Sequence, residues 1–126
     1  MLKAHTRILI ADDDVDERNF VYYALLHYGY KVEAAVDGEE AVEKARAFKP
    51  DLVILDVLMP RKTGLEAANE IRGDLRFRGV PVIFLTGLKN DHDVAGDGPN
   101  AILAKPLEVT QLIGVMDRLL SSSTQG

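Results

Sequence analysis

The strongest constraint on the fold of this chain is a repeated alternation of short apolar runs with helical patterns. Residues 7–11, 31–35, 51–56, 80–85 and 101–104 form the apolar runs and are predicted to be strands. Segment 51–56 (D-L-V-I-L-D) is apolar at consecutive positions, which is typical of a strand covered on both faces. The pattern predicts an α/β fold built on a parallel sheet.

Amphipathic helices are expected between most of these strands and after the last one, because apolar residues recur there at helical spacing. Gly29 and Pro50 are predicted to end the first two helices. The expected buried faces are Val21, Ala24, Leu25 and Tyr28; Ala41, Val42, Ala45 and Phe48; Leu65, Ala68, Ile71 and Leu75; and Leu112, Met116 and Leu119. Right-handed crossovers would place such helices on both faces of the sheet.

Composition is that of one ordinary domain, which we expect to span residues 7–120, followed by a flexible tail at 121–126. The 126 residues contain no cysteine, which excludes disulfides and thiol catalysis. A net charge of −5 makes nucleic-acid binding a poor hypothesis. The apolar runs are far shorter than the ~20 residues that a membrane span needs, so no membrane contact is expected. The absence of cysteine fits the cytoplasmic location that we expect.

Polar residues follow four of the predicted strands at the point where each strand ends. They are Asp12 to Asp14 after the first strand, Asp56 at the end of the third, Thr86 after the fourth and Lys105 after the fifth. Because ligands of open α/β sheets bind beyond the carboxyl ends of the strands, these side chains mark the expected functional site.

The acidic run has two interpretations. One carboxylate, Asp14, is well explained as a helix cap, which stabilises a helix by roughly 1 kcal/mol. Capping does not explain three acids in a row, since like charges 4 Å apart repel by up to ~4 kcal/mol at an effective dielectric near 20. A hard divalent cation removes that repulsion, and carboxylate oxygens are ligands that Mg²⁺ prefers.

The other strand-end residues are each weak evidence when taken alone. Asp56 could begin a turn before Met59-Pro60, Thr86 is an ordinary strand residue, and most lysines such as Lys105 are surface groups. Their recurrence at one end of successive strands is hard to explain as surface chemistry and favours a shared site.

In order, the motifs are I-L-I-A-D-D-D, D-L-V-I-L-D-V-L-M-P-R-K-T-G-L-E, V-P-V-I-F-L-T-G and A-K-P-L. This set resembles the response-regulator receiver family, which is CheY-like, over about residues 7–120. The resemblance implies a flavodoxin-like, five-stranded parallel sheet in the order 2-1-3-4-5 with helices on both faces. It also implies a phosphorylation-dependent signalling switch of a two-component or phosphorelay system, rather than an enzyme.

The resemblance implies that Asp56 is the phosphoacceptor and that Mg²⁺ is the cofactor. Asp13, Asp56 and the backbone carbonyl of Leu58 would hold the metal directly, and Asp12 would support it through water. The implied partners are a sensor histidine kinase or a phosphotransfer protein, and a downstream protein target.

The same resemblance implies roles for the residues after the fourth and fifth strands. Thr86 would donate a hydrogen bond to the phosphoryl group, and Lys105 would pair first with Asp56 and then with that group. Gly87 would leave room beside the acceptor, and the bond before Pro106 would be cis.

Three departures from the family pattern bear on signalling. Ile102 stands where the family usually carries an aromatic residue, so we expect the usual coupling between threonine and aromatic ring to be absent or altered. The segment between Thr86 and Lys105 is short and rich in glycine, which predicts a short or irregular fourth helix. Leu58 and Leu88 flank the acceptor with apolar side chains, which predicts slow self-dephosphorylation.

Two other functions remain open from the sequence. A pseudo-receiver would bind partners without phosphorylation, although the retained Asp13, Asp56, Thr86 and Lys105 argue against it. A Mg²⁺-dependent phosphatase with an aspartyl nucleophile would use the Asp12-x-Asp14 spacing, but 126 residues leave no room for the usual cap domain.

Overall fold

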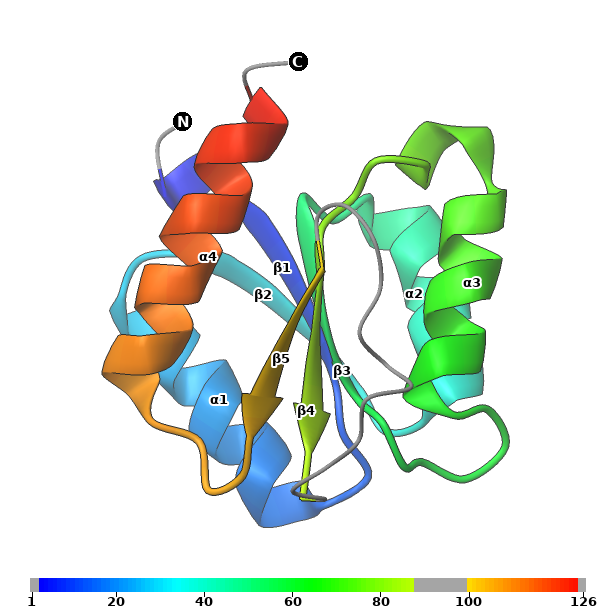
Figure 1. Cartoon of the computed structure of the whole chain (residues 1–126), viewed down its shortest axis with the longest axis horizontal. Helices are drawn as coiled ribbons and strands as arrows, with labels where there is room; N and C mark the ends of the chain where they lie inside the picture. The colour runs from blue at the N-terminus through cyan, green and yellow to red at the C-terminus, as the bar shows by residue number, and fades with distance from the viewer. Residues whose placement is uncertain (1–2, 88–99, 125–126) are drawn as a thin grey trace.

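The computed structural model describes residues 3–87 and 100–124, with side chains as far as Ser121 (Figure 1). Five parallel strands form one sheet in the order β2-β1-β3-β4-β5, which confirms the expected topology. The elements in chain order are η1 (Lys3–His5), β1 (Arg7–Ala11), α1 (Val15–His27), β2 (Lys31–Ala35), α2 (Gly38–Phe48), β3 (Leu52–Asp56), α3 (Gly64–Gly73), η2 (Leu75–Phe77), β4 (Val82–Thr86), β5 (Asn100–Ala104) and α4 (Val109–Thr124).

Helices cover both faces of the sheet, with α1 and α4 on one face and α2 and α3 on the other (Figure 1). Alternate residues of each central strand point to opposite faces, so the chain builds two apolar layers. Ile8, Ile10, Leu52 and Ile54 pack with Val21 and Leu25 of α1 and Leu112 and Met116 of α4. Leu9, Val53 and Leu55 pack with Val42 and Ala45 of α2 and Ala68 and Ile71 of α3.

The helices begin at side chains that satisfy their first backbone N–H groups. Asp14, Asp37 and Thr63 are the N-caps of α1, α2 and α3, and each accepts a hydrogen bond from the backbone N–H three residues later. In α3 the cap is a full capping box, because the Glu66 carboxylate accepts from the Thr63 N–H in return. Gly29 follows α1 with a φ of +98°, a conformation that glycine adopts without strain.

Three expected core residues lie at the surface. Leu65, in the first turn of α3, is 38% exposed, and Tyr28 and Leu75 are exposed because their helices end earlier than the pattern predicts. Tyr28 comes just after α1 and is 37% exposed, with Lys3 packed over its ring. Leu75 comes after the end of α3 and is 76% exposed, while Phe77 of η2 is buried in its place.

The last helix is longer than the sequence predicts. The expected boundary between domain and tail at Ser121 falls inside α4, which continues to Thr124. The predicted short or irregular fourth helix lies within residues 88–99, outside the described residues. Within the two described ranges, no helix combines the length and the apolar character that crossing a membrane requires.

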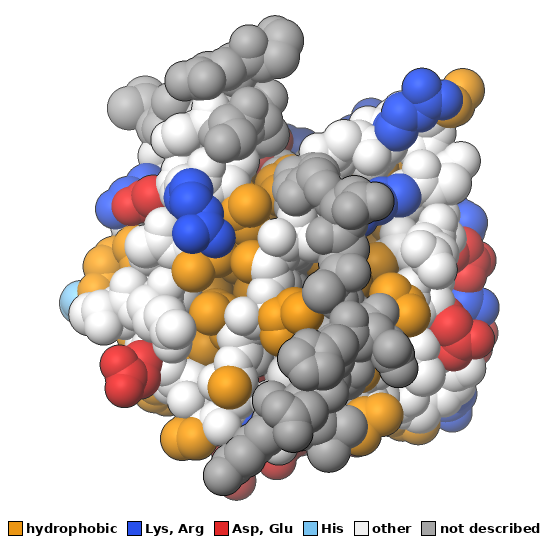
Figure 2. Space-filling view, viewed as in Figure 1, with side chains coloured by type: hydrophobic (Ala, Val, Ile, Leu, Met, Phe, Trp, Pro, Cys, Tyr) orange, Lys and Arg blue, Asp and Glu red, His pale blue; other side chains and the backbone are white. Residues whose placement is uncertain are grey.

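The edge strand β5 is less covered than the rest of the sheet. Asn100, Ala101 and Ile102 are only half-buried, whereas β3 and β4 are buried along their whole length. In the view of Figure 2, apolar side chains gather between α4 and α3, on the side of the molecule where β5 lies.

Substitution of Leu25 and of its neighbour Leu26 tests which face of α1 packs on the sheet. Leu25 is fully buried and Leu26 is 40% exposed. We expect Leu25→Ala to lower the free energy of unfolding by about 2–5 kcal/mol, because it leaves a cavity in the core. Leu26→Ala should change it by less than about 0.5 kcal/mol. Urea unfolding of the two variants measures both values, and equal losses would contradict the assigned face.

Candidate functional site

The register of the two central strands brings the predicted carboxylates together. Ala11 of β1 pairs with Leu55 of β3, so Asp12 and Asp56 are the next residues along neighbouring strands. Asp13 extends the first strand end by one residue. Ligand atoms of Asp12, Asp13 and Asp56 all lie within 4.8 Å of one another. Asp12 and Asp56 are buried, and Asp13 is exposed.

The Asp12 carboxylate is fully buried close to other carboxylates. Burial raises its pKa to about 8; the Asp14 backbone N–H lowers it, and the nearby Glu17 and Asp56 carboxylates raise it further. Its Oδ1 accepts from that N–H at 2.9 Å, while its buried Oδ2 has no hydrogen-bond partner among the described residues. A buried carboxylate oxygen without a donor is what a bound cation would satisfy.

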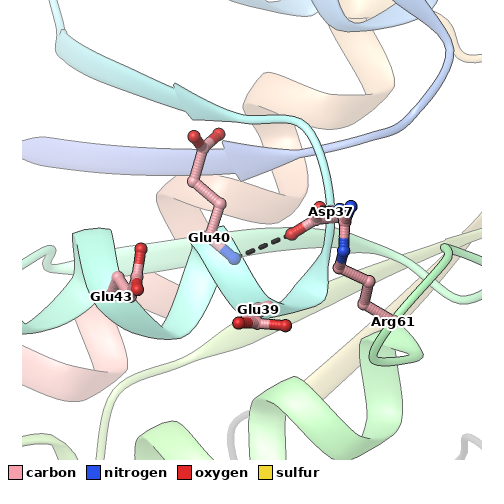
Figure 3. Close-up of a pocket in the computed structure, with 5 residues that line it drawn as sticks. All are labelled: Asp37, Glu39, Glu40, Glu43 and Arg61. Atoms are coloured by element: carbon pink, nitrogen blue, oxygen red, sulfur yellow. Dashed lines mark hydrogen bonds and ion pairs between the residues drawn. The ribbon is translucent and has the colours of Figure 1, made fainter.

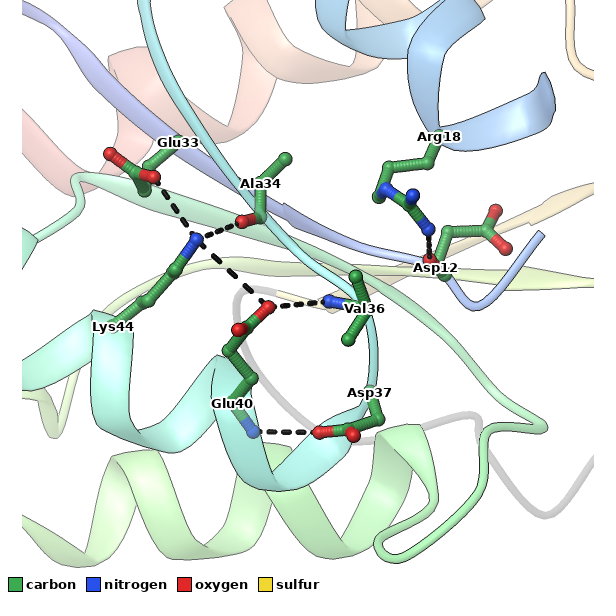
Figure 4. Close-up of polar contacts among 8 residues, drawn as sticks. All are labelled: Asp12, Arg18, Glu33, Ala34, Val36, Asp37, Glu40 and Lys44. Atoms are coloured by element: carbon green, nitrogen blue, oxygen red, sulfur yellow. Dashed lines mark hydrogen bonds and ion pairs between the residues drawn. The ribbon is translucent and has the colours of Figure 1, made fainter. Parts of the chain in front are cut away.

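Helix α1 is anchored directly to this strand end. Asp14 caps the helix by accepting from the Glu17 N–H at 3.0 Å, so the capping interpretation of the acidic run holds for this one acid. Arg18 donates to the backbone carbonyl of Asp12 at 2.8 Å (Figure 4). The cap and the arginine together hold the start of α1 against the end of β1.

Lys105 supplies the cation of the site. Its Nζ lies 2.9 Å from Oδ2 of Asp56 and 3.3 Å from Oε2 of Glu17. Partial burial lowers the pKa of Lys105, but the hydrogen bond to Asp56 and the charges of Asp56, Asp12 and Glu17 outweigh burial, so the pKa is raised. The ammonium is therefore held in its charged form beside the predicted phosphoacceptor.

The residues after β4 and β5 lie at the same edge of the sheet. Thr86 ends β4 and is 5% exposed, and its backbone carbonyl accepts from the Lys105 N–H at 2.9 Å. Gly87 follows it at the surface. The Lys105–Pro106 bond is cis, as the sequence resemblance implies.

The three residues that depart from the family pattern lie in different places relative to Asp56. The Leu58 side chain is 62% exposed, and its backbone N–H donates to Oδ1 of Asp56 at 3.3 Å. Ile102, two strands away on β5, is half-buried and packs against the core beneath α2 and α3. Leu88 lies outside the described residues.

A further ion pair, which the sequence did not reveal, holds the loop that follows Asp56. Arg61 adopts a φ of +70° and donates to Oδ2 of the buried Asp37 at 2.8 Å. These two residues border a pocket of about 330 Å³ that is otherwise lined by Glu39, Glu40 and Glu43 (Figure 3). The pair ties the start of α2 to the loop between β3 and α3.

Glu40 and Lys44 of α2 bind the end of β2 and the residue that follows it. The Glu40 carboxylate accepts from the Val36 N–H at 2.8 Å, and Lys44 donates to the Ala34 carbonyl at 2.5 Å and to Glu33 at 3.2 Å (Figure 4). None of the residues predicted from the strand ends lines this pocket, so it is separate from the carboxylate cluster.

Gly64, the first residue of α3, packs directly against the backbone of Asp56. A Cβ at this position would lie 2.2 Å from the Asp56 carbonyl oxygen and 3.1 Å from Cα of Val57. The Gly64 N–H donates to the Val57 carbonyl at 2.9 Å. The close approach of helix and strand end therefore requires glycine and fixes the backbone of Asp56.

The donor set fits a hard divalent cation. Three carboxylates converge, one of them has a buried oxygen without a donor, and no sulfur or imidazole ligand is present among them. Asp56 also has Lys105 within hydrogen-bond distance. The site can thus hold a nucleophilic carboxylate between two sources of positive charge, an arrangement suited to phosphoryl transfer.

Comparison with known proteins identifies the family of the chain. Residues 8–117 match the family model described as the response regulator receiver domain. The chain is 38% identical over 123 residues to "Response regulator MprA" of Mycolicibacterium vanbaalenii, covering 94% of this chain and 52% of that protein. It is 40% identical over 119 residues to "Transcriptional regulatory protein PdtaR" of Mycobacterium tuberculosis, covering 91% of this chain and 57% of that protein. The chain therefore spans about half the length of these relatives.

Solved structures share the whole architecture. The receiver domain of sensor histidine kinase PA1611 from Pseudomonas aeruginosa, solved with a magnesium ion in its active-site cleft, superposes with a TM-score of 0.84 at 30% identity, covering 92% of this chain and 98% of that one. The chemotaxis protein CheY4 of Vibrio cholerae gives a TM-score of 0.82 at 30% identity, covering 90% of this chain and 98% of that one.

Gly64→Ala tests whether the start of α3 fixes the Asp56 backbone. The added methyl group would meet backbone atoms that cannot move alone, so we expect a loss of about 1–3 kcal/mol in the free energy of unfolding. Gly73→Ala, at the other end of the same helix, is the control, because no described atom lies within 4 Å of its Cβ position. It should be neutral or stabilise by up to ~1 kcal/mol. Urea unfolding of both variants checks this, and equal stabilities would count against the close approach.

Proposed function

The chain belongs to the response regulator receiver family, and from that premise we propose that it is a phosphorylation-dependent switch whose phosphoacceptor is Asp56. The observation that carries the proposal is the environment of Asp56. Its carboxylate is buried, lies within 4.8 Å of the Asp12 and Asp13 carboxylates and pairs with Lys105 at 2.9 Å. Receiver domains are signalling domains, and we propose that this one assists only its own phosphorylation and dephosphorylation.

Mg²⁺ is the cofactor that the donor set supports. We propose that Asp13, Asp56 and the Leu58 carbonyl hold the ion and that Asp12 supports it through water. The similar structure of the PA1611 receiver domain contains a magnesium ion in its active-site cleft, which supports this assignment. When bound, Mg²⁺ offsets negative charge on the transferring phosphoryl group.

The protein side chains then have distinct tasks in phosphoryl transfer. An ionised Asp56 oxygen attacks phosphorus, and the bond from phosphorus to the donor breaks with its electron pair leaving on the donor. Lys105 exchanges its contact with the carboxylate for one with the new phosphoryl oxygens. The Thr86 hydroxyl donates to the same group, and Gly87 leaves room for it.

Signalling requires the phosphorylated form to differ in shape from the resting form. A shift from 1:99 to 99:1 takes roughly 5.5 kcal/mol of differential interaction, and contacts to Thr86 and Lys105 would supply part of it. Ile102 is β-branched and packs on the core. We therefore propose that it does not change rotamer on phosphorylation, as an aromatic residue at this position would. Output then depends on backbone changes around β4 and β5.

The partners follow from the chemistry of the acceptor. We propose a sensor histidine kinase or a histidine phosphotransfer protein as the donor, a downstream protein as the target, and a cytoplasmic location. The curated relatives are about twice as long as this chain, which therefore matches only the receiver part of them.

Incubation with a small phosphodonor and Mg²⁺, followed by intact mass measurement, tests the main proposal. We expect the wild-type chain to gain one phosphoryl group, and Asp56→Asn to gain none because the amide is not a nucleophile. Removal of Mg²⁺ with a chelator should slow the gain by at least about tenfold, the loss of roughly 1.4 kcal/mol of transition-state stabilisation.

The same measurement separates the two alternatives. No adduct with any donor would favour a pseudo-receiver. Continued turnover of a generic phosphate ester would favour a phosphatase, because a receiver stops after one phosphoryl group.

Leu58→Asn tests whether the apolar side chain next to Asp56 limits water access. An amide can orient a water molecule by one hydrogen bond, worth about 1 kcal/mol, so phosphoryl loss should accelerate about three- to tenfold. Leu75→Asn is the control, since Leu75 is 76% exposed on η2. Decay of the phosphorylated mass species gives the rates, and an unchanged rate in Leu58→Asn would refute the role of Leu58.

A further inference from the structure

Glu17 makes a contact that the proposed function does not use. It is the third residue of α1, and its Oε2 lies 3.3 Å from Nζ of Lys105. Its side chain is 22% exposed, and its buried Oε1 has no hydrogen-bond partner among the described residues. Lys105 is therefore shared between two carboxylates, Asp56 and Glu17.

The orientation of Glu17 is not explained by helix capping. In α3 the equivalent residue, Glu66, turns back and accepts from the N–H of the N-cap Thr63 at 3.0 Å. In α1 the N–H of the N-cap Asp14 donates instead to Oδ1 of Asp12 at 2.9 Å. The Glu17 carboxylate is thus released from the cap and reaches the strand-end site.

The position of Glu17 on α1 also directs it inward. Val21, one turn later on the same side of the helix, is fully buried in the core between α1 and the sheet. Because Arg18 ties the start of α1 to the Asp12 carbonyl at 2.8 Å, the carboxylate at position 17 is held over the site.

We propose that Glu17 is a positioning residue that acts through Lys105 and restrains phosphorylation of Asp56, an inference that rests on the proposed function. Glu17 competes with an incoming phosphoryl group for the Lys105 ammonium. It also adds negative charge where an anionic group must arrive. Replacing it by a neutral residue of the same shape frees the ammonium for the phosphoryl oxygens.

Phosphorylation rates at saturating Mg²⁺ with a small phosphodonor test this role. We expect Glu17→Gln to react at least about threefold faster than the wild type, since one opposing charge is removed. Asp16→Asn is the matched control, because it removes the same charge from the same helix turn at an exposed side chain. It should react at the wild-type rate. An unchanged or slower Glu17→Gln variant, or an equal gain in Asp16→Asn, overturns the inference.

Repeating the measurement in a Lys105→Gln variant separates an action of Glu17 through Lys105 from direct repulsion between Glu17 and the phosphodonor. In Lys105→Gln chains, the additional Glu17→Gln change should no longer accelerate phosphorylation. Persistence of the full acceleration there overturns action through Lys105. If the wild-type chain takes no phosphoryl group at all, the proposed function fails, and this result is distinct from a failed Glu17 effect.

The ion pair can also be measured without any phosphoryl group. Urea midpoints of the wild type, Glu17→Gln, Lys105→Gln and the double variant form a cycle. With Lys105 present, Glu17→Gln loses an ion pair; without it, the same change only relieves repulsion from Asp12 and Asp56. We expect a more favourable midpoint shift in the Lys105→Gln background. Additive shifts would show that Glu17 and Lys105 are not coupled, and the inference would fail.

Discussion

The pairing of β1 with β3 is the constraint on which the rest of this molecule depends. Its register places Asp12 beside Asp56 at the end of two buried strands, where water cannot screen their charges. The other features of the site offset the repulsion between these carboxylates or hold them in place. Lys105 reaches Asp56 from β5, Arg18 secures the start of α1, and the donor set fits a divalent cation.

Supports outside the site keep this crowded edge in place. The loop after Asp56 is braced by the pair of Arg61 with the buried Asp37, and Gly64 lets α3 pack against the Asp56 backbone. A rigid Asp56 would suit the proposed phosphoryl transfer, because positioning and charge stabilisation supply most of the rate of such reactions. These contacts hold the backbone on both sides of Asp56 in a fixed position.

Sequence patterns predicted the strands and the residues at their ends, because buried strands show apolar runs that stop at the first polar residue. The order of the strands came from the family resemblance alone, since crossover connections leave no local pattern in the sequence. Patterns were less reliable for helix ends and for α1. Tyr28 and Leu75 were assigned to core faces but lie beyond the last residues of their helices. Phe20 and Tyr23 are 51% and 64% exposed, so apolar character alone did not mark the buried face of α1.

Local sequence patterns were enough to predict the fold class, and the resemblance to a known family marked the expected site at Asp12, Asp13, Asp56, Thr86 and Lys105. The fold class and the site residues can be predicted in this way because each depends on short segments of consecutive residues. The ion pairs of Glu17 with Lys105 and of Arg61 with Asp37 became visible only in the folded chain. Each of these pairs joins loops or helices whose relative rotation is set by core packing, which no local pattern encodes.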